Sequence, residues 1–386
     1  MANENVIITG ARAPVAVDIG RSFCAANFSV HFADSVRPWA AICSNSSQSG
    51  YHHLPPARTN FHEFANCLYD LVNELQPALL IPTCEEVFYV SAAAEMLGFA
   101  DIVFAPPLKT LRTLHSKIEF VKFASELGIP APQTWSLSDK VGLQSIPLST
   151  DQLVLKPEFS RFGNSALLRP SEKQIEGWEP TSGQNWAAQT FIEGEEICVW
   201  TAAREGEIVA SAAYRPKWRF GQTAAYAFET ISCPAAVEIA KTIAKATHLD
   251  GHLSFDMILT ANGDTLPIEC NPRAVSGLHL FDASPDLALA ILNKRKCHAT
   301  ESLRYLSLGM LFLGIPAALR HGRLGGLLKD WRDGRDVLSR IRDRLPILGT
   351  VADTARFAVV GLLKGNSPAG QTTDDIEWNG EPLLWK

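Results

Sequence analysis

The order of apolar and polar positions predicts a parallel α/β region over about the first hundred residues. Short apolar runs typical of buried strands alternate there with segments of helical periodicity. The strands are expected at 5–9, 28–33 and 78–81, and the helices at 13–26, 61–75 and 85–97. Strands that alternate with helices in this way indicate an open parallel sheet.

The pattern changes after the proline pair at 106–107. A helix is expected at 117–127, and strand-rich sequence then dominates to about residue 230. A helix at 235–246 and a pair of strands within 253–270 follow. From about residue 300 the chain is helical, punctuated by glycine and rich in arginine. The second part of the chain therefore reads as α+β, followed by a helical extension.

Composition and charge indicate the compartment of the protein and the partners that it does not bind. The 386-residue chain is 46% apolar and 20% charged, and its net charge of −6 argues against non-specific nucleic-acid binding. Its eight cysteines form no CxxC pair, which favours free thiols in a reducing compartment. The N-terminus lacks the features of a signal peptide. We expect a cytoplasmic protein that does not bind nucleic acid.

The arginine-rich C-terminal region has two interpretations. Its longest apolar stretch, residues 305–319, is too short to span a bilayer and contains Pro316, so no transmembrane segment is expected. Seven arginines follow between residues 320 and 344. Beside apolar segments they suggest docking to a membrane surface or a partner helix. We favour a solvated amphipathic cap over the preceding domain.

The most informative segment is residues 251–273, GHLSFDMILTANGDTLPIECNPR. Asn-Gly at 262–263 between two apolar runs is a strong signal for a β-hairpin with a two-residue loop. A longer Asn-Gly-Asp loop is the alternative, and it would leave the register open. With the two-residue loop, the pairs that share one face are Asp256 with Glu269 and Ser254 with Asn271.

Two carboxylates that face each other across a strand pair repel, so something must neutralise Asp256 and Glu269. Hard oxygen ligands of this kind, completed by phosphates and water, are what Mg²⁺ binds. The alternative is the solvated outer face of an exposed hairpin, and the residues alone do not decide between the two.

Two lysines and a short loop are candidates for contact with phosphates. Lys156 ends the strand 153–155, and Lys117 stands just before a predicted helix. The loop 158–165, with its single Gly163, offers backbone N–H groups and a guanidinium. The alternatives are a lysine that reaches to solvent, a solvated helix face and a plain turn.

Residues 189–196, QTFIEGEE, read as a strand that leads into an acidic turn. Backbone groups in such a segment can meet an adenine edge, and a carboxylate a few residues later can accept ribose hydroxyls. Taken alone, the segment is equally consistent with an ordinary strand and turn.

These pieces occur in an order that resembles the ATP-grasp superfamily, closest to its carboxylate–amine ligases and carbamoyl-phosphate-synthase-like members. The order is Lys117 before "GIPAP", "VLKP", "QTFIEGEE", "SFDMI" and "IECNPRAVSG". "VIITGARAPVAVDIGR" and "IPTCEE" look like the domain that precedes such folds. The resemblance covers about residues 1–285. It departs from the family in its loop 158–165, which has only one glycine.

The resemblance implies an N-terminal open parallel α/β (pre-ATP-grasp) domain, a two-lobed ATP-grasp fold and a C-terminal helical extension. The expected boundaries are 1–110, 111–300 with lobes at about 111–190 and 191–300, and 301–386. It also implies ATP and Mg²⁺ as cofactors, with two ions expected and Mn²⁺ as a substitute. Small-molecule carboxylate and amine substrates are implied, and a homodimer is compatible with it.

The resemblance also implies a role for each matching residue. Nucleotide binding falls to Lys117, Lys156, Gly163, Gln189, Phe191, Ile192 and Glu196. Metal binding falls to Asp256, Glu269 and Asn271. Arg273 and Lys156 are the expected catalytic residues, with Arg273 on the transferred phosphoryl group or the substrate carboxylate. Independently of the resemblance, Arg12 and Glu85 lie at the ends of N-terminal strands, where open α/β sheets bind ligands, and Arg215 lies in a basic-aromatic loop. Substrate contacts are expected from these three residues and from Ser276 and Gly277. Lids that exclude water from an acyl phosphate are expected at residues 158–165 and 215–226.

The implied activity is an ADP-forming ligase that activates a carboxylate as an acyl phosphate and couples it to an amine. Transfer of the γ-phosphoryl group supplies the leaving group that a carboxylate lacks, and the protein contributes positioning and charge neutralisation. Bicarbonate chemistry and a non-catalytic ATP-binding module are the alternatives. A nicotinamide dehydrogenase is disfavoured because the first turn, from Gly10 to Val15, lacks GxGxxG.

Overall fold

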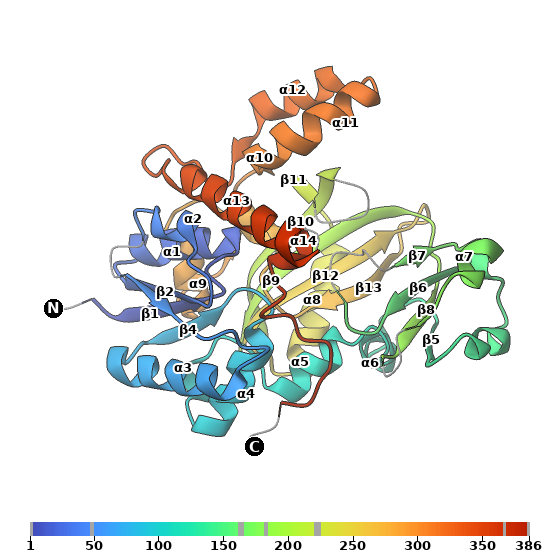
Figure 1. Cartoon of the computed structure of the whole chain (residues 1–386), viewed down its shortest axis with the longest axis horizontal. Coiled ribbons are helices and arrows are strands. Elements are labelled where there is room, and N and C mark those ends of the chain that lie inside the picture. Colours follow the sequence, from blue (N-terminus) through green and yellow to red (C-terminus); the bar gives the residue numbers. More distant parts are fainter. Residues whose placement is uncertain are drawn as a thin grey trace.

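The computed structural model describes residues 3–46, 50–160, 166–180, 184–219, 225–365 and 368–383. Its first sheet is all-parallel in the order β3-β2-β1-β4, which confirms the predicted open α/β region (Figure 1). The strands are β1 (Asn5–Thr9), β2 (Ser29–Asp34), β3 (Tyr51–His53) and β4 (Leu79–Pro82). The short β3 has no apolar run and was not predicted.

Helices flank this sheet, as its continuous apolar strands require. They are α1 (Pro14–Ala25), α2 (Trp39–Ile42), α3 (Phe61–Leu75), α4 (Val87–Leu97), the short η1 (Ala100–Ile102) and α5 (Leu108–His115). The turn into α1 needs a glycine, because Gly10 has φ +61° and a Cβ there would lie 2.5 Å from the Glu86 carboxylate. Pro14 at the first helical position then starts α1.

The second sheet is antiparallel, in the order β5-β8-β6-β7. Its strands are β5 (Thr134–Leu137), β6 (Leu153–Pro157), β7 (Leu167–Leu168) and β8 (Trp186–Thr190). The short helices η2 (Val141–Ser145), η3 (Thr150–Gln152) and α7 (Glu172–Glu176) belong to the same part of the chain, whereas α6 (Glu119–Glu126) precedes it and packs on β13. A small core that includes Leu155, Trp178 and Trp186 lies on this sheet.

The third sheet has eight strands, in the order β13-β12-β9-β10-β11-β15-β16, with β14 paired to β10. They are β9 (Glu195–Arg204), β10 (Glu207–Arg219), β11 (Ala225–Thr230), β12 (Gly251–Leu259), β13 (Thr265–Asn271), β14 (Cys297–His298), β15 (Leu303–Tyr305) and β16 (Arg335–Asp336). Helix α8 (Pro234–Ala246) packs on it, and η4 (Ser276–Leu280) and α9 (Asp286–Ile291) connect it to α1. One hydrophobic core runs from Ile8 to Trp200 and Phe228, and so joins the first sheet to the third.

The C-terminal region is less purely helical than predicted. It holds α10 (Ser307–Gly309), the π-helical η5 (Met310–Gly314), α11 (Ile315–Arg320), α12 (Leu324–Asp333), α13 (Pro346–Lys364) and α14 (Pro368–Gln371). However, β15 and β16 also come from this region, so the third sheet crosses the expected boundary at residue 300. Hydrogen bonding to β11 outweighs the helical tendency of the surrounding sequence at these few residues.

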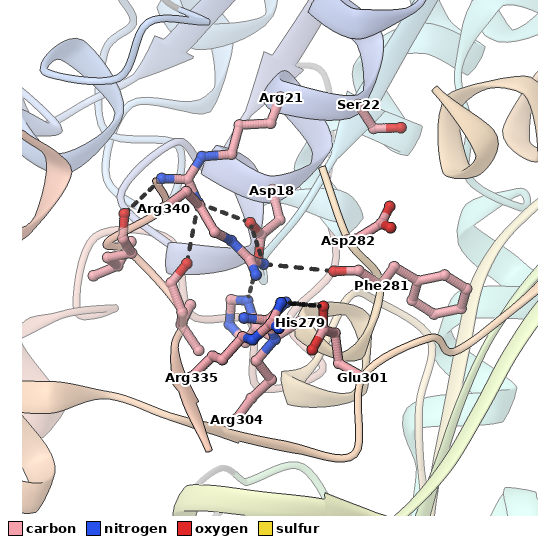
Figure 2. Close-up of polar contacts among 12 residues, drawn as sticks. Asp18, Arg21, Ser22, His279, Phe281, Asp282, Glu301, Arg304, Arg335 and Arg340 are labelled. Atoms are coloured by element: carbon pink, nitrogen blue, oxygen red, sulfur yellow. Dashed lines mark hydrogen bonds and ion pairs between the residues drawn. The ribbon is translucent and has the colours of Figure 1, made fainter. Parts of the chain in front are cut away.

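A buried charge network ties α1 to the C-terminal region (Figure 2). The Asp18 carboxylate contacts the guanidinium groups of Arg21 at 2.9 Å and Arg340 at 3.1 Å, and accepts a hydrogen bond from His279 Nδ1 at 2.8 Å. Arg21 also binds Asp343 at 2.8 Å. Three segments far apart in the sequence therefore meet at one carboxylate.

The end of the chain returns to the first sheet. Trp378 is 3% exposed, and its ring stacks on Phe88 at 4.6 Å and meets Phe159 edge-on at 5.2 Å. Tyr89 donates a hydrogen bond from its hydroxyl to the Glu377 carbonyl at 2.9 Å. We call residues 372–383 the C-terminal strap; it is drawn in red below α14 in Figure 1. The strap links α4 to the segment that follows β6.

Replacing Tyr89 by phenylalanine should loosen this strap without unfolding the protein. The change removes one partly buried hydrogen bond, which contributes about 1 kcal/mol. We expect faster amide hydrogen exchange in residues 372–383, and no change there in Tyr69→Phe, whose side chain is exposed on α3. Equal exchange in the wild type and in Tyr89→Phe would show that this contact does not hold the strap.

Candidate active site

The predicted carboxylate pair is present in the hairpin of β12 and β13. Asp256 lies opposite Glu269, and Ser254 lies opposite Asn271. The turn is longer than the two-residue loop expected at 262–263. Strand β12 ends at Leu259, β13 begins at Thr265, and residues 260–264 join them. A bulge next to Asp256 then restores the register that a two-residue loop would have given.

Hydrogen bonds order the polar groups of the hairpin. Asn271 donates from its amide to Asp256 Oδ2 at 3.3 Å, and Cys198 donates from its thiol to Asp256 Oδ1 at 3.2 Å. Ser254 instead donates to the carbonyl of Arg273 at 2.8 Å, so its hydroxyl supports the chain beyond β13. The hairpin thus presents two carboxylates and one amide at a single place.

The two carboxylates have opposite pKa shifts. Burial, and next the charge of Glu269, raise the pKa of Asp256 to about 6. Burial also opposes ionisation of Glu269, but Lys117 and Lys156 outweigh it and lower the pKa of this carboxyl. Of the two carboxyls, Asp256 is therefore the one that is protonated more easily.

Both predicted lysines are buried and directed toward these carboxylates. Lys117, between α5 and α6, places Nζ 3.7 Å from Glu269 Oε2 and donates to the Ser160 carbonyl at 3.2 Å. Lys156 ends β6 and donates to Gln189 Oε1 and to the Ile268 carbonyl, both at 3.1 Å. Burial lowers the pKa of Lys156 to about 8. The second and third sheets therefore meet at this group of charges.

Arg273 connects the hairpin to the first sheet. Its guanidinium donates to Glu85 Oε1 and to Asn271 Oδ1, both at 3.0 Å. Glu85 is fully buried just after β4, at the carboxyl end of the parallel sheet, where open α/β sheets bind ligands. Arg273 and Glu85, each predicted separately as a site residue, thus lie side by side, between the metal-ligand candidates and the N-terminal sheet.

The segment expected to meet the adenine joins two sheets. Gln189 is the penultimate residue of β8, and Phe191 and Ile192 connect β8 to β9. The Phe191 N–H bonds the Gln152 carbonyl at 2.8 Å. Glu196, expected at the ribose, forms a two-fold ion pair with Arg219 at 2.7 and 2.8 Å. Its carboxylate is therefore fixed in place by a residue at the end of β10.

Four expected site residues have other surroundings. Arg12 is buried between Asp34 and Asp375, so its guanidinium is occupied by ion pairs to the protein itself and does not line an open acceptor site. Gly277 is packed against Tyr214 and Trp200, where a Cβ would lie 2.6 Å from the tyrosine ring. Arg215 pairs with Glu195 on the surface, and Ser276 is partly buried in η4. Gly163, also expected at the site, lies outside the described residues.

Comparison with known proteins finds similar folds among solved structures. No family model and no curated protein matches the chain. An L-amino acid ligase from Bacillus licheniformis has 15% identity and a TM-score of 0.55 over 72% of this chain and 69% of its own. An N5-carboxyaminoimidazole ribonucleotide synthetase from Thermotoga maritima has 18% identity and a TM-score of 0.57, with 77% and 78% covered.

A third similar structure is a biotin carboxylase domain of 2-oxoglutarate carboxylase from Hydrogenobacter thermophilus, described in complex with MgADP, ADP and bicarbonate. It has 13% identity and a TM-score of 0.59, and 79% of this chain and 73% of that chain are covered. The chain has the fold of the ATP-grasp superfamily. At these identities the likeness establishes the ATP-grasp fold alone, and the chemistry has to be argued from the site.

Three further residues belong to this group of polar side chains. Cys198 and Arg219 contact Asp256 and Glu196 from neighbouring strands, and only the strand pairing brings them there. His115 is buried beside Phe88 and Phe159, and burial lowers its pKa to about 4, so the ring is neutral. Arg219 lies in the expected lid 215–226, but its contact with Glu196 was not predicted, and neither Cys198 nor His115 was named as a site residue.

The residues at the hairpin fit a divalent cation. No group of three or more His, Cys, Asp or Glu suited to a metal exists in the described part of the chain. The hairpin offers only two carboxylates, Asp256 and Glu269, and one amide, Asn271. A cation bound here would need phosphate oxygens and water as its other ligands. The raised pKa of Asp256 beside Glu269 marks a pair of charges that a cation would relieve.

Affinity for Mn²⁺, used as a probe of the cation site, should fall as the pH drops below about 6. Protonation of Asp256 removes one ligand charge, so the affinity should decline about tenfold per pH unit below its pKa. Titration calorimetry of Mn²⁺ with a non-hydrolysable ATP analogue between pH 5 and pH 8 measures this. Asp256→Asn should bind weakly with a flat profile, whereas a flat profile in the wild type would contradict the assignment.

Proposed function

We propose that this protein is an ADP-forming ligase that uses Mg·ATP to activate a carboxylate and couples it to an amine. The observation that carries the proposal is the meeting of the paired carboxylates Asp256 and Glu269 with the buried lysines Lys117 and Lys156. This arrangement offers cations for phosphate oxygens and acidic oxygens for a metal, within one region between two sheets. The shared fold with ATP-dependent ligases supports the same chemistry.

The lysines hold the triphosphate in this proposal. Lys117 and Lys156 are buried, so their attraction for phosphate oxygens is screened little by water. Both already donate to carbonyl or amide oxygens, and a phosphate would replace these partners. When bound, Mg²⁺ supplies charge neutralisation for the phosphate oxygens. The protein thereby orients the γ-phosphoryl group without forming a covalent bond to it.

Arg273 faces the reacting carboxylate. Its guanidinium lies between Asn271 of the metal-ligand set and Glu85 of the N-terminal sheet. A carboxylate placed beside it would be oriented by a two-fold ion pair. Arg273 then donates to the oxyanion that forms when the amine attacks the acyl phosphate. Glu85 fixes the guanidinium in this position and balances its charge.

The acceptor amine would approach from the carboxyl end of the first sheet, the usual ligand side of open α/β sheets. In this chain the C-terminal strap covers part of that edge, through Asp375 at Arg12 and Trp378 at Phe88. The strap therefore forms one wall of the acceptor site. An amino acid or a small metabolite is the proposed acceptor class.

The test is release of ADP and phosphate with pools of carboxylic acids and amines, including all proteinogenic amino acids and bicarbonate. Release that needs both an acid and an amine supports the ligase. Release with bicarbonate alone would instead favour carboxyphosphate chemistry. Tight binding of Mg·ATP without release from any pool would favour a non-catalytic binding module, and absence of ATP binding would overturn the proposal.

A further inference from the structure

Exposed apolar side chains gather in one part of the chain. The described residues include sixteen large hydrophobic side chains that are exposed, and twelve of them lie between residues 311 and 363. Single exposed apolar residues are ordinary, but a concentration of this size marks an interaction surface. We call it the C-terminal apolar surface: Leu311, Phe312, Leu313, Leu319, Leu328, Ile341, Leu345, Leu348, Val351, Val359, Leu362 and Leu363.

This surface is built from two structures. The helices α11 and α12 form a hairpin that projects from the body of the molecule at the top of Figure 1. Helix α13 follows along the chain and lies across α2 on the same upper side of the view. Phe312 is 66% exposed just before α11, and Leu363 is 82% exposed near the end of α13. Both structures therefore direct apolar groups outward.

The inner face of α13 is fixed to the protein. Asp353 accepts hydrogen bonds from the backbone N–H groups of Trp39 at 3.0 Å and Ala40 at 2.9 Å, at the start of α2. Gly349 lies so close to Trp39 that a Cβ would stand 2.3 Å from its carbonyl oxygen. By length and composition alone α13 qualifies as a membrane span, with 22% of its apolar window buried. Its attachment to α2 places it along a surface instead.

Exposed basic residues alternate with these apolar residues along the same segment of the chain. Residues 301–365 contain eleven arginines and lysines and six acids, although the whole chain has a net charge of −6. The contrast is sharper among exposed residues of this segment, where a single acid, Asp333, is exposed. The exposed basic residues are Arg320, Arg323, Lys329, Arg332, Arg335, Arg342, Arg344 and Lys364. The surface therefore complements a partner that is anionic and apolar together.

We propose that the C-terminal apolar surface docks onto the surface of an anionic lipid bilayer. Apolar side chains enter the boundary between headgroups and acyl chains, and the exposed arginines and lysines of the same segment meet anionic headgroups. A second copy of the chain fits less well, because a two-fold contact would oppose the same basic residues. Nucleic acid would match the charge but leave the apolar residues without partners. The protein thus works as a peripheral enzyme with its N-terminal and ATP-binding regions in water.

Flotation of the full-length protein with lipid vesicles tests this. Vesicles of phosphatidylcholine with about 30% phosphatidylglycerol should bind about tenfold more protein than pure phosphatidylcholine, and added salt should reduce the difference. The triple substitution Phe312→Glu, Leu319→Glu and Leu363→Glu should abolish flotation. It should leave release of ADP in solution unchanged, because none of the three residues belongs to the site.

A matched control changes the same number of charges elsewhere. Tyr69→Glu, Met96→Glu and Val141→Glu alter exposed apolar residues outside the segment and should float like the wild type. Flotation with neither vesicle would overturn the proposal. So would a dimer in light scattering that only the C-terminal triple variant dissociates, since the second copy would then be the occupant.

Discussion

Replacing Glu269 by glutamine should lower the rate of ADP release by about 100-fold or more, because a metal ligand and its charge are lost together. Lys117 and Lys156 hold the Glu269 carboxyl ionised despite its burial. Glutamine has the same shape and cannot ionise, so the packing of β13 is retained while the negative charge facing Asp256 is removed. Steady-state ADP release, together with Mn²⁺ affinity from calorimetry, measures the effect.

The matched control is Glu207→Gln at the start of β10. This carboxylate is 68% exposed in its weak pair with Lys296, so the change should leave both ADP release and Mn²⁺ affinity unaltered. If a Glu269→Gln variant kept wild-type turnover, the hairpin would not be part of the catalytic site. A folded variant that loses turnover but keeps its Mn²⁺ affinity would show that Glu269 acts by positioning Lys117 and Lys156 and not as a metal ligand.

Replacing Asp18 by asparagine should lower the free energy of unfolding by about 3 kcal/mol or more. The change leaves the guanidinium groups of Arg21 and Arg340 buried with one counter-charge fewer, and loss of one partner from a buried pair is strongly destabilising (Figure 2). Thermal unfolding followed by circular dichroism measures the loss. The exposed pair of Arg332 and Asp333 provides the control, and Asp333→Asn should melt with the wild type.

The difference in free energy of unfolding between the wild type and Asp18→Asn should depend on pH. Burial opposes ionisation of Asp18, but Arg340 and His279 outweigh it and hold the pKa of this carboxyl well below its usual range. A depressed pKa contributes stability above the unfolded value of about 4, and that stability is lost as the pH falls below it. The difference in stability between the wild type and Asp18→Asn should therefore begin to shrink as the pH falls below about 4, and should go on shrinking toward the depressed pKa of the folded state. A difference that stays constant from pH 7 to pH 3 would show that charge is not its cause.

Local patterns predicted much of the fold and the centre of the site. Apolar periodicity placed the first sheet, and the strand period put Asp256 opposite Glu269. That pairing was right although the loop was not, because a bulge in β13 compensates for the longer turn at 260–264. Side chains alternate between the two faces of every strand, so the face of a residue can be predicted from local sequence. The loop length depends on how both strands twist and pair.

Contacts across long sequence separations were not predictable. Arg12 follows a strand in the sequence like a ligand-binding residue, yet Asp375, 363 positions later, occupies its guanidinium. Nothing near either residue signals the other. The strap residue Trp378 and the pairing of Glu196 with Arg219 are of the same kind, since each depends on how separate elements pack. Motifs identified the charges of the site, and packing decided which of them remain available to a ligand.

The most direct test of the proposed chemistry follows oxygen from the acid to phosphate. The acid identified by the ADP-release screen would be labelled with ¹⁸O in its carboxylate and incubated with the protein, Mg·ATP and the amine. An acyl phosphate passes one carboxylate oxygen to the phosphate released, so mass spectrometry should find one ¹⁸O atom in each phosphate and ADP as the nucleotide product. Unlabelled phosphate, or AMP with labelled carboxylate oxygen, would contradict the account.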